Sequence, residues 1–122
     1  MSKNLDNEGL RSIVDNYDIF YIDLWGVVHN GIKLHQKAID TLIKISKAKK
    51  KYVLLTNAPR PNRTVKIFLE KMKMDKEIRE KVYTSGEAAL SYLKINHLNK
   101  KFYHIGPPRD FDLFVDFEDS KT

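Results

Sequence analysis

Short apolar runs alternate with segments of helical periodicity along this chain. Four runs have the length and β-branched or aromatic content of strands: 18–23, 52–56, 81–83 and 102–105. Each is bounded by polar, glycine or proline residues. Continuous apolar strands that alternate with helices are typical of a parallel sheet. The pattern therefore predicts an α/β protein with a twisted, doubly wound parallel sheet and helices on both faces.

The segments between these runs repeat their apolar residues every three or four positions, which indicates amphipathic helices. Helices are expected over 8–16, 36–50 and 62–74, from Thr84 onward, and briefly after Asp110. The second of these should bury a stripe of Ala38, Ile39, Leu42, Ile43 and Ala48. The helix after 81–83 should bury Ala88, Ala89, Tyr92 and Leu93. Its start, Thr84-Ser85-Gly86-Glu87, fits a capping box with Thr84 as N-cap.

Polar side chains follow the first two predicted strands. Asp23 comes directly after an apolar run, and Thr56-Asn57 ends the next one. The carboxyl ends of parallel strands form the crevice where ligands bind in open α/β sheets. A carboxylate there can act as a covalent nucleophile, and a hydroxyl with loop amides can hold phosphate oxygens. The alternative is structural, because an Asp after a strand often forms a turn and Thr-Asn often caps a helix.

Composition limits the class of protein. A chain of 122 residues fits one small domain, and it has no cysteine for disulfides or thiolate metal sites. The first residues contain no signal-type apolar segment, and no run is long enough to span a membrane, so a cytoplasmic location is expected. The net charge of +6 is read as a solvated lysine surface rather than a polyanion site. The four histidines have no metal-ligand spacing.

Four segments in order resemble the haloacid dehalogenase-like hydrolase superfamily. YDIFYIDLWGVVHNG is similar to its first motif, an apolar strand that ends in a nucleophilic Asp. YVLLTNAP is similar to the second motif, a strand that ends in Thr or Ser. VYTSGEAALSYL followed by KKFYHIGPP resembles the class IIA branch, which contains the nitrophenylphosphatase-like and phosphoglycolate phosphatase-like proteins. The resemblance covers about Asp15 to Phe114.

The resemblance implies a Mg²⁺-dependent phosphohydrolase fold and assigns roles to individual residues. Asp23 would be the nucleophile that forms an aspartyl-phosphate and also a Mg²⁺ ligand, with the backbone carbonyl of Trp25 as a second ligand. Thr56 and Asn57 would bind the phosphoryl group of a small phosphorylated molecule. Gly31 would lie in a flap over the site.

Departures from the family pattern limit the expected activity. Trp25 stands where the family has a second Asp that transfers protons, and Trp cannot do so. The later motifs, a Lys and further acidic Mg²⁺ ligands, do not occur in the printed sequence. Its acidic residues Asp112, Asp116, Glu118 and Asp119 are not presented by an apolar strand. Residues 1–86 would be the N-terminal part of the core, and 87–122 the start of a truncated cap region.

Three functions remain open at this stage. The first is a phosphohydrolase-like protein that is weakly active or inactive alone. The second is a non-catalytic remnant or interaction module that keeps the fold. The third is a basic nucleic-acid-binding domain, against which stands the lack of a stripe of interleaved lysines and aromatics. In the family sheet, strand 18–23 is central, so here it is expected at an exposed apolar edge. Such an edge predicts a homo-oligomer or a separate chain that carries the missing half.

Overall fold

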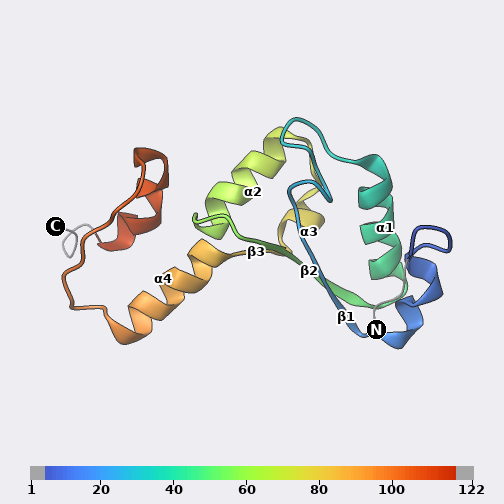
Figure 1. Ribbon diagram of the computed structural model, residues 1–122, viewed down its shortest axis with the longest axis horizontal. Coiled ribbons are helices and arrows are strands. Elements are labelled where there is room, and N and C mark those ends of the chain that lie inside the picture. Colours follow the sequence, from blue (N-terminus) through green and yellow to red (C-terminus); the bar gives the residue numbers. More distant parts are fainter. Residues whose placement is uncertain (1–4, 118–122) are drawn as a thin grey trace.

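The computed structural model describes residues 5–117 of the chain. Three parallel strands alternate with helices, and short 3-10 segments precede and follow them (Figure 1). The elements are η1 (Leu10–Ser12), η2 (Val14–Asn16), β1 (Ile19–Ile22), α1 (Gln36–Lys47), β2 (Lys51–Thr56), α2 (Asn62–Lys71), α3 (Lys76–Arg79), β3 (Val82–Thr84), α4 (Ser85–Asn96) and η3 (Pro108–Phe117). The short helix expected over 8–16 is thus a pair of 3-10 turns, and α3 was not predicted.

The sheet has the order β1-β2-β3, and both strand pairs are parallel. Ile22 of β1 is in register with Leu54 of β2, and Thr56 at the end of β2 is in register with Thr84 of β3. The prediction of an α/β fold with a parallel sheet is confirmed. β1 lies at an edge of this sheet, as expected.

One face of the sheet carries the hydrophobic core. Leu54 in the central strand is fully buried, and Leu69 of α2 packs in the same cluster. From α1 the buried residues are Ile39, Leu42 and Ile45. The predicted stripe was partly wrong: Ile43 is 38% exposed, and Ile45 takes the inward position because it lies one turn from Leu42.

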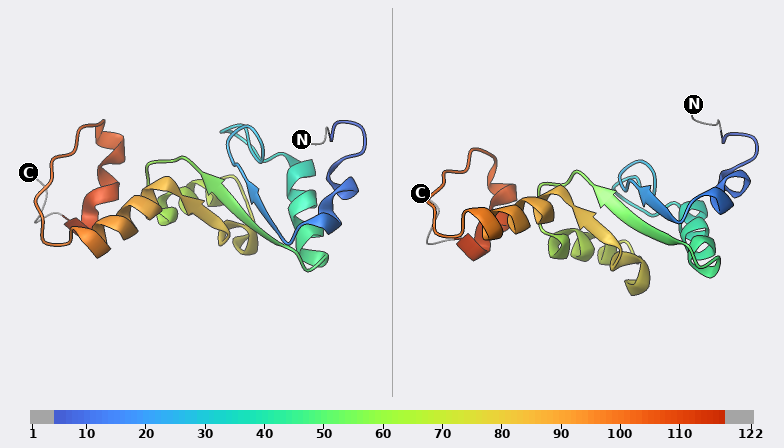
Figure 2. Two further views of the ribbon diagram at one scale, coloured as in Figure 1. Left: turned by 60° about the horizontal axis from the view of Figure 1, so that its bottom comes forward. Right: turned by 90° about the horizontal axis from the view of Figure 1, so that it is seen from below.

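The opposite face of the sheet is open. Helices α1, α2 and α3 all lie on the same side of the strands (Figure 2). Ile19, Tyr21, Leu55 and Tyr83 alternate with the core residues along the strands and are exposed, Tyr21 to 68%. Helices had been expected on both faces. In the described part of the chain the second helical layer does not occur, because successive crossovers between β1, β2 and β3 place their helices on one side.

The predicted strand over Phe102–Ile105 does not join the sheet. The segment is irregular, and its aromatic ring at Phe102 packs 5.1 Å from Phe114 of η3, centroid to centroid. The expectation for α4 was also wrong, since Ala88, Ala89 and Tyr92 are exposed. α4 points away from the sheet and contacts β3 at its start and η3 further along (Figure 1). Leu90 is the buried apolar side chain of α4, one that the predicted stripe omitted.

The start of α4 has the predicted N-cap, Thr84, but only this half of the predicted capping box, because the Thr84 N–H bonds the Asn62 side chain instead of Glu87. The Thr84 hydroxyl accepts the Glu87 N–H at 2.8 Å, which satisfies one of the free N–H groups at the start of the helix. The same hydroxyl donates to the Arg60 carbonyl in the loop after β2. Gly86 lies so close to the Arg60 backbone that a Cβ atom would overlap it. The loop after β2 and the start of α4 are therefore packed backbone to backbone.

Gly86→Ala should destabilise the fold, because the added methyl group meets rigid backbone rather than a movable side chain. Overpacking of this kind costs about 1–3 kcal/mol. Urea unfolding followed by circular dichroism measures the loss. Ser91→Ala, on the exposed side of the same helix, is the control and should leave the unfolding midpoint almost unchanged. An unchanged midpoint for Gly86→Ala would contradict this prediction, because it would show that the backbone at Arg60 moves to accommodate the methyl group at little cost.

Candidate active site

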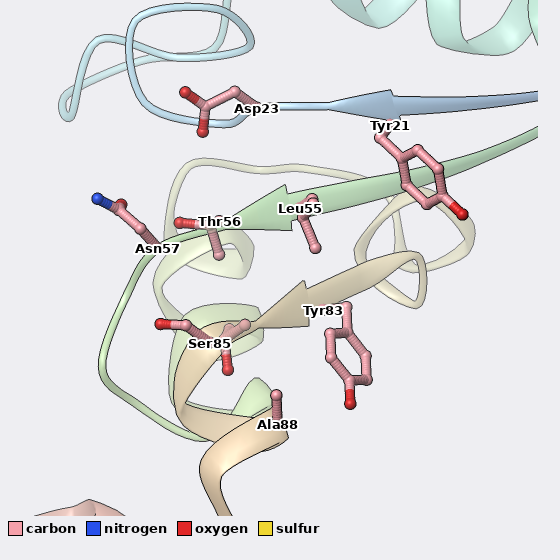
Figure 3. Close-up of a pocket in the computed structure, with 9 residues that line it drawn as sticks. Tyr21, Asp23, Leu55, Thr56, Asn57, Tyr83, Ser85 and Ala88 are labelled. Carbon is pink, nitrogen blue, oxygen red and sulfur yellow. The ribbon is translucent and has the colours of Figure 1, made fainter.

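Asp23 lies just beyond the last residue of β1, at the carboxyl edge of the sheet. Its side chain is exposed, and its Oδ1 accepts the Leu24 N–H at 2.9 Å. This bond fixes the carboxylate against its own backbone, so that the group projects past the strand end. Figure 3 shows the carboxylate directed to the same side as the head groups of Thr56, Asn57 and Ser85.

Thr56 and Asn57 lie at the end of the neighbouring strand. Thr56 is half-buried, and its hydroxyl accepts the Ala58 N–H at 3.3 Å. Asn57 is exposed. These two residues and Asp23 line one hollow of about 610 Å³. The structure therefore brings the three side chains proposed from the sequence into one crevice, and the roles assigned to them stay predictions.

Ser85 also belongs to this crevice, although the sequence suggested only a place in a capping box. It follows β3 directly, and its hydroxyl donates to the Ala58 carbonyl at 3.1 Å. All three strands thus end in a polar side chain at one edge. The signal was available, because the predicted third strand ends at Tyr83 and the next hydroxyls must fall at the same edge as Asp23.

Trp25 points elsewhere. Its side chain lines a separate hollow of about 290 Å³ together with His29, Arg60 and Phe68. Thr56 lines both hollows, so the two meet at the end of β2. The indole is 65% exposed and lies edge-to-face against His29, with centroids 5.3 Å apart. The proposed use of the Trp25 carbonyl as a metal ligand stays a prediction.

The turn after Asp23 is held by a compact set of backbone bonds. The Leu24 carbonyl accepts the N–H groups of Val27, Val28 and His29 at 3.1, 2.8 and 3.2 Å. Gly26 has a φ of 82°, a conformation that favours glycine. Gly31 has a φ of 87° and lies against the Trp25 ring, so that any Cβ there would overlap the indole. The turn therefore fixes both the indole and the segment that follows it.

His29 is a residue that sequence reasoning missed. It is only 3% exposed, and its Nδ1 accepts the Gly31 N–H at 2.9 Å. Burial lowers the pKa of His29 from its ordinary value of 6.5, and the nearby His35 lowers it further, while Asp23 opposes the shift. The ring is therefore neutral near pH 7, with its proton on Nε2. Spacing rules for metal ligands could not find it, because its role is in the turn.

A metal ion in the crevice would have one carboxylate, that of Asp23, among the described lining residues. Among the residues that the structure describes, no three His, Cys, Asp or Glu side chains form a group suited to a metal ion. Mg²⁺ is commonly held by one or two carboxylates, with waters and substrate phosphate oxygens completing its shell. Asp23 and the hydroxyl and amide oxygens beside it fit such a hydrated ion only in part.

Two acidic residues of η3 contact α2 and the loop before it, and neither lines the crevice at Asp23. Asp112 accepts the Thr64 hydroxyl at 2.6 Å, and Asp110 lies 3.8 Å from the Arg60 guanidinium. These contacts dock η3 on the start of α2 and the loop before it. Glu118 and Asp119 lie outside the described residues. No helix among residues 5–117 is long and apolar enough to cross a membrane.

Comparisons with known proteins agree on one family. The model of haloacid dehalogenase-like hydrolases matches residues 20–117. A haloacid dehalogenase-like hydrolase from Brucella suis has 28% identity and a TM-score of 0.73, over 87% of this chain and 38% of that one. No curated protein sequence matches.

Two phosphatase structures share the fold. The 4-nitrophenylphosphatase of Thermotoga maritima has 20% identity and a TM-score of 0.68, over 84% of this chain and 39% of its own. The glycerol phosphate phosphatase of Mycobacterium tuberculosis was solved in complex with magnesium. It has 22% identity and a TM-score of 0.62, over 85% of this chain and 31% of its own. The chain thus spans about two fifths or less of the length of these structures.

The buried neutral His29 should make stability depend on pH. Because its folded pKa is lowered, the contribution is complete above about pH 6.5 and is lost as the pH falls below that value. Urea unfolding of the wild type and of His29→Asn, between about pH 8 and pH 5, measures this. Asn can still accept the Gly31 N–H, so the variant should lose less stability toward low pH. His97→Asn, at the exposed end of α4, should keep the wild-type slope. Equal slopes for all three proteins would exclude His29 as the source.

Proposed function

Because this chain belongs to the haloacid dehalogenase-like hydrolase family, we propose that it acts on phosphate esters of small molecules with Asp23 as the nucleophile. The observation that supports this most is the placement of Asp23 and Thr56 at the ends of adjacent parallel strands, where they line one crevice. The likeness to 4-nitrophenylphosphatase and glycerol phosphate phosphatase folds supports a phosphatase-like activity of the class IIA type.

The proposed reaction has two steps. A carboxylate oxygen of Asp23 attacks phosphorus, the bond to the ester oxygen breaks, and the leaving alcohol takes a proton from water. A second water then hydrolyses the aspartyl-phosphate and releases inorganic phosphate. The Thr56 hydroxyl, which accepts the Ala58 N–H and keeps its own proton, and the Asn57 amide would donate to the oxygens of the transferring group. Both side chains project to the same side as the Asp23 carboxylate (Figure 3). Asp23 and the Trp25 carbonyl would hold Mg²⁺, which neutralises phosphate charge when bound.

The same geometry limits the rate. Trp25 stands where the family has its proton-transferring Asp, and its side chain lines the neighbouring hollow. The absence of a general acid typically costs about 10²–10⁴-fold. Only one carboxylate lines the crevice in the described part of the chain, so charge neutralisation is also weak. We therefore infer slow phosphoryl transfer in this chain taken alone.

A non-catalytic role is the second candidate, and Trp25 is the observation that favours it. An indole that is locked against Gly31 and edge-to-face with His29 suits a packing or recognition role better than proton transfer. The two candidates differ in one measurable event, the formation of a covalent bond at Asp23.

If the proposed function holds, Asp23 should become phosphorylated. The chain is incubated with 4-nitrophenyl phosphate and Mg²⁺, quenched in acid and examined by intact-protein mass spectrometry and peptide mapping. One phosphoryl group should appear on Asp23. Asp23→Asn should abolish it, whereas Asp18→Asn, at the opposite end of β1, should not. No adduct in the wild type, with Mg²⁺ and substrate in excess, would favour the non-catalytic role.

The missing general acid can be tested by restoring it. Turnover of 4-nitrophenyl phosphate by the wild type should be close to background, because Trp25 replaces the general acid and a single carboxylate lines the crevice in the described part of the chain. Trp25→Asp restores a carboxyl group at the position of the family's general acid, and it should raise turnover by up to about 10²-fold. Trp25→Asn is the matched control, since it has the same size but cannot transfer a proton. Equal rates for both variants would show that relief of bulk, not acid catalysis, causes any gain.

A further inference from the structure

The hollow beside the candidate crevice is built from the same two strand ends. Asp23 lines the crevice, whereas Trp25, two residues later, lines the hollow. In the same way Asn57 lines the crevice and Ala58 lines the hollow, with Thr56 shared by both. A molecule whose phosphate lies in the crevice therefore has the hollow directly beside it for the rest of its structure.

Neither end of the chain is needed to form this hollow. Its described lining residues all fall within 24–68, on the turn after β1, the loop after β2 and the first turns of α2. Most of them are apolar, as is usual for a site that binds a small molecule. The volume of about 290 Å³ has room for roughly ten water-sized groups, at about 30 Å³ each. A small ring with one substituent has this size.

His29 contributes a hydrogen-bond donor to the hollow. The residue is 3% exposed, and it lines the hollow together with Trp25 and Phe68, whose rings contact the imidazole edge-to-face. Its Nδ1 accepts the Gly31 N–H, so the ring proton lies on Nε2. Within residues 5–117 this Nε2–H makes no hydrogen bond. A donor fixed by packing is therefore available to an acceptor in the hollow.

Arg60 brings positive charge to the same hollow. Asp110 lies 3.8 Å from its Nε, and in the described part of the chain neither Nη group makes a hydrogen bond. Asp110 does not line the hollow, and no Asp or Glu occurs among the described residues that do. A guanidinium binds a carboxylate through two parallel N–H···O bonds. The hollow therefore suits an anionic group.

The walls that carry these groups are fixed before anything binds. The Arg60 carbonyl accepts the Thr84 hydroxyl, and the Arg60 backbone packs so closely on Gly86 that a Cβ there would overlap it. On the other wall, the Trp25 ring packs against Gly31 in the same way. A site that is already in its bound arrangement loses less conformational entropy on binding.

We propose that this hollow binds the leaving group of the phosphate ester, and that it selects a small aromatic ring with a carboxylate. The ring packs between the walls formed by Trp25 and Phe68. The carboxylate accepts hydrogen bonds from Arg60 and from the Nε2–H of His29. The assignment of a leaving group rests on the proposed function, which places the phosphoryl group in the crevice that shares Thr56 with the hollow.

The free leaving group tests the hollow without phosphate chemistry. The chain is titrated with 4-hydroxybenzoate and followed by NMR through the indole N–H of Trp25, the single tryptophan. A saturable shift is expected, with a dissociation constant of about 1 mM for a ligand of this size. The uncharged 4-hydroxybenzamide should bind about tenfold more weakly, because it lacks the charge-assisted bonds. Acetate has the charge but no ring, and it should also bind about tenfold more weakly.

Substitution of Arg60 tests the source of this preference. Arg60→Gln should bind 4-hydroxybenzoate and 4-hydroxybenzamide with equal affinity, because Gln has no charge. Arg60→Lys should keep part of the preference, since Lys keeps the charge but not the paired N–H groups. Arg63→Gln is the matched control, because Arg63 does not line the hollow, and it should keep the wild-type preference. Circular dichroism establishes that each variant is folded before it is compared.

The reaction itself tests whether the hollow receives the leaving group. At concentrations below saturation, 4-carboxyphenyl phosphate should phosphorylate Asp23 about tenfold faster than 4-carbamoylphenyl phosphate, and Arg60→Gln should remove the difference. Equal rates for the two esters with the wild type would overturn the assignment of a leaving group.

Four results of the titration would overturn the proposal. They are the lack of a saturable shift, a shift that spares the Trp25 signal, equal affinities for the acid and the amide, and an undiminished preference in Arg60→Gln. The titration contains no Mg²⁺ and no phosphate, so its failure is distinct from a failure of the proposed function. Binding of 4-hydroxybenzoate through Arg60 without any adduct at Asp23 would refute the proposed function and support the carboxylate-binding hollow.

Discussion

The candidate site depends on a set of hydrogen bonds that ties the loop after β2 to the start of α4. The Asn62 side chain accepts the Thr84 N–H at 2.9 Å, and the Glu87 carboxylate accepts the Asn62 N–H at 3.0 Å. Gly86 permits the backbone approach that these bonds require. Because the residues between Thr56 and Asn62 are anchored at both ends, Asn57 and Ser85 are brought to the same edge as Asp23. These bonds are part-buried, and a polar network away from water is stabilising only when each member has its partner.

The strands and the crevice could be predicted because their causes are local. Apolar runs specify β1 and β2, and the parallel arrangement then places Asp23 and Thr56 side by side. The N-cap at Thr84 is likewise a short-range signal, and the structure has it. The reciprocal bond of a capping box does not form, because the Glu87 carboxylate accepts the Asn62 N–H instead of the Thr84 N–H. These features follow from strand sterics, from the burial of apolar side chains and from unsatisfied N–H groups at a helix start.

The features that could not be predicted depend on what each segment packs against. The sequence around Phe102 predicts a strand, but in the structure its ring packs against Phe114 of η3 and the segment does not join the sheet. Tyr92 has helical spacing, yet α4 leaves the sheet and Tyr92 stays exposed. His29 gave no signal because its burial arises from the closed turn after Asp23 and from Phe68 of α2, whose ring lies 5.8 Å away. Tertiary partners, not local pattern, decide these positions.

The position of the indole has a further, optical consequence. Trp25 is the single tryptophan of the chain, and it lies two residues beyond Asp23 in van der Waals range of Gly31 and edge-to-face with His29. All indole emission from this protein therefore originates within one turn of the candidate nucleophile. An imidazole that gains a proton quenches a neighbouring indole, so the emission intensity also reports the charge of His29. The protein thus carries a fluorophore in the hollow that adjoins the crevice, and a rearrangement of the turn after Asp23 can be followed without any label.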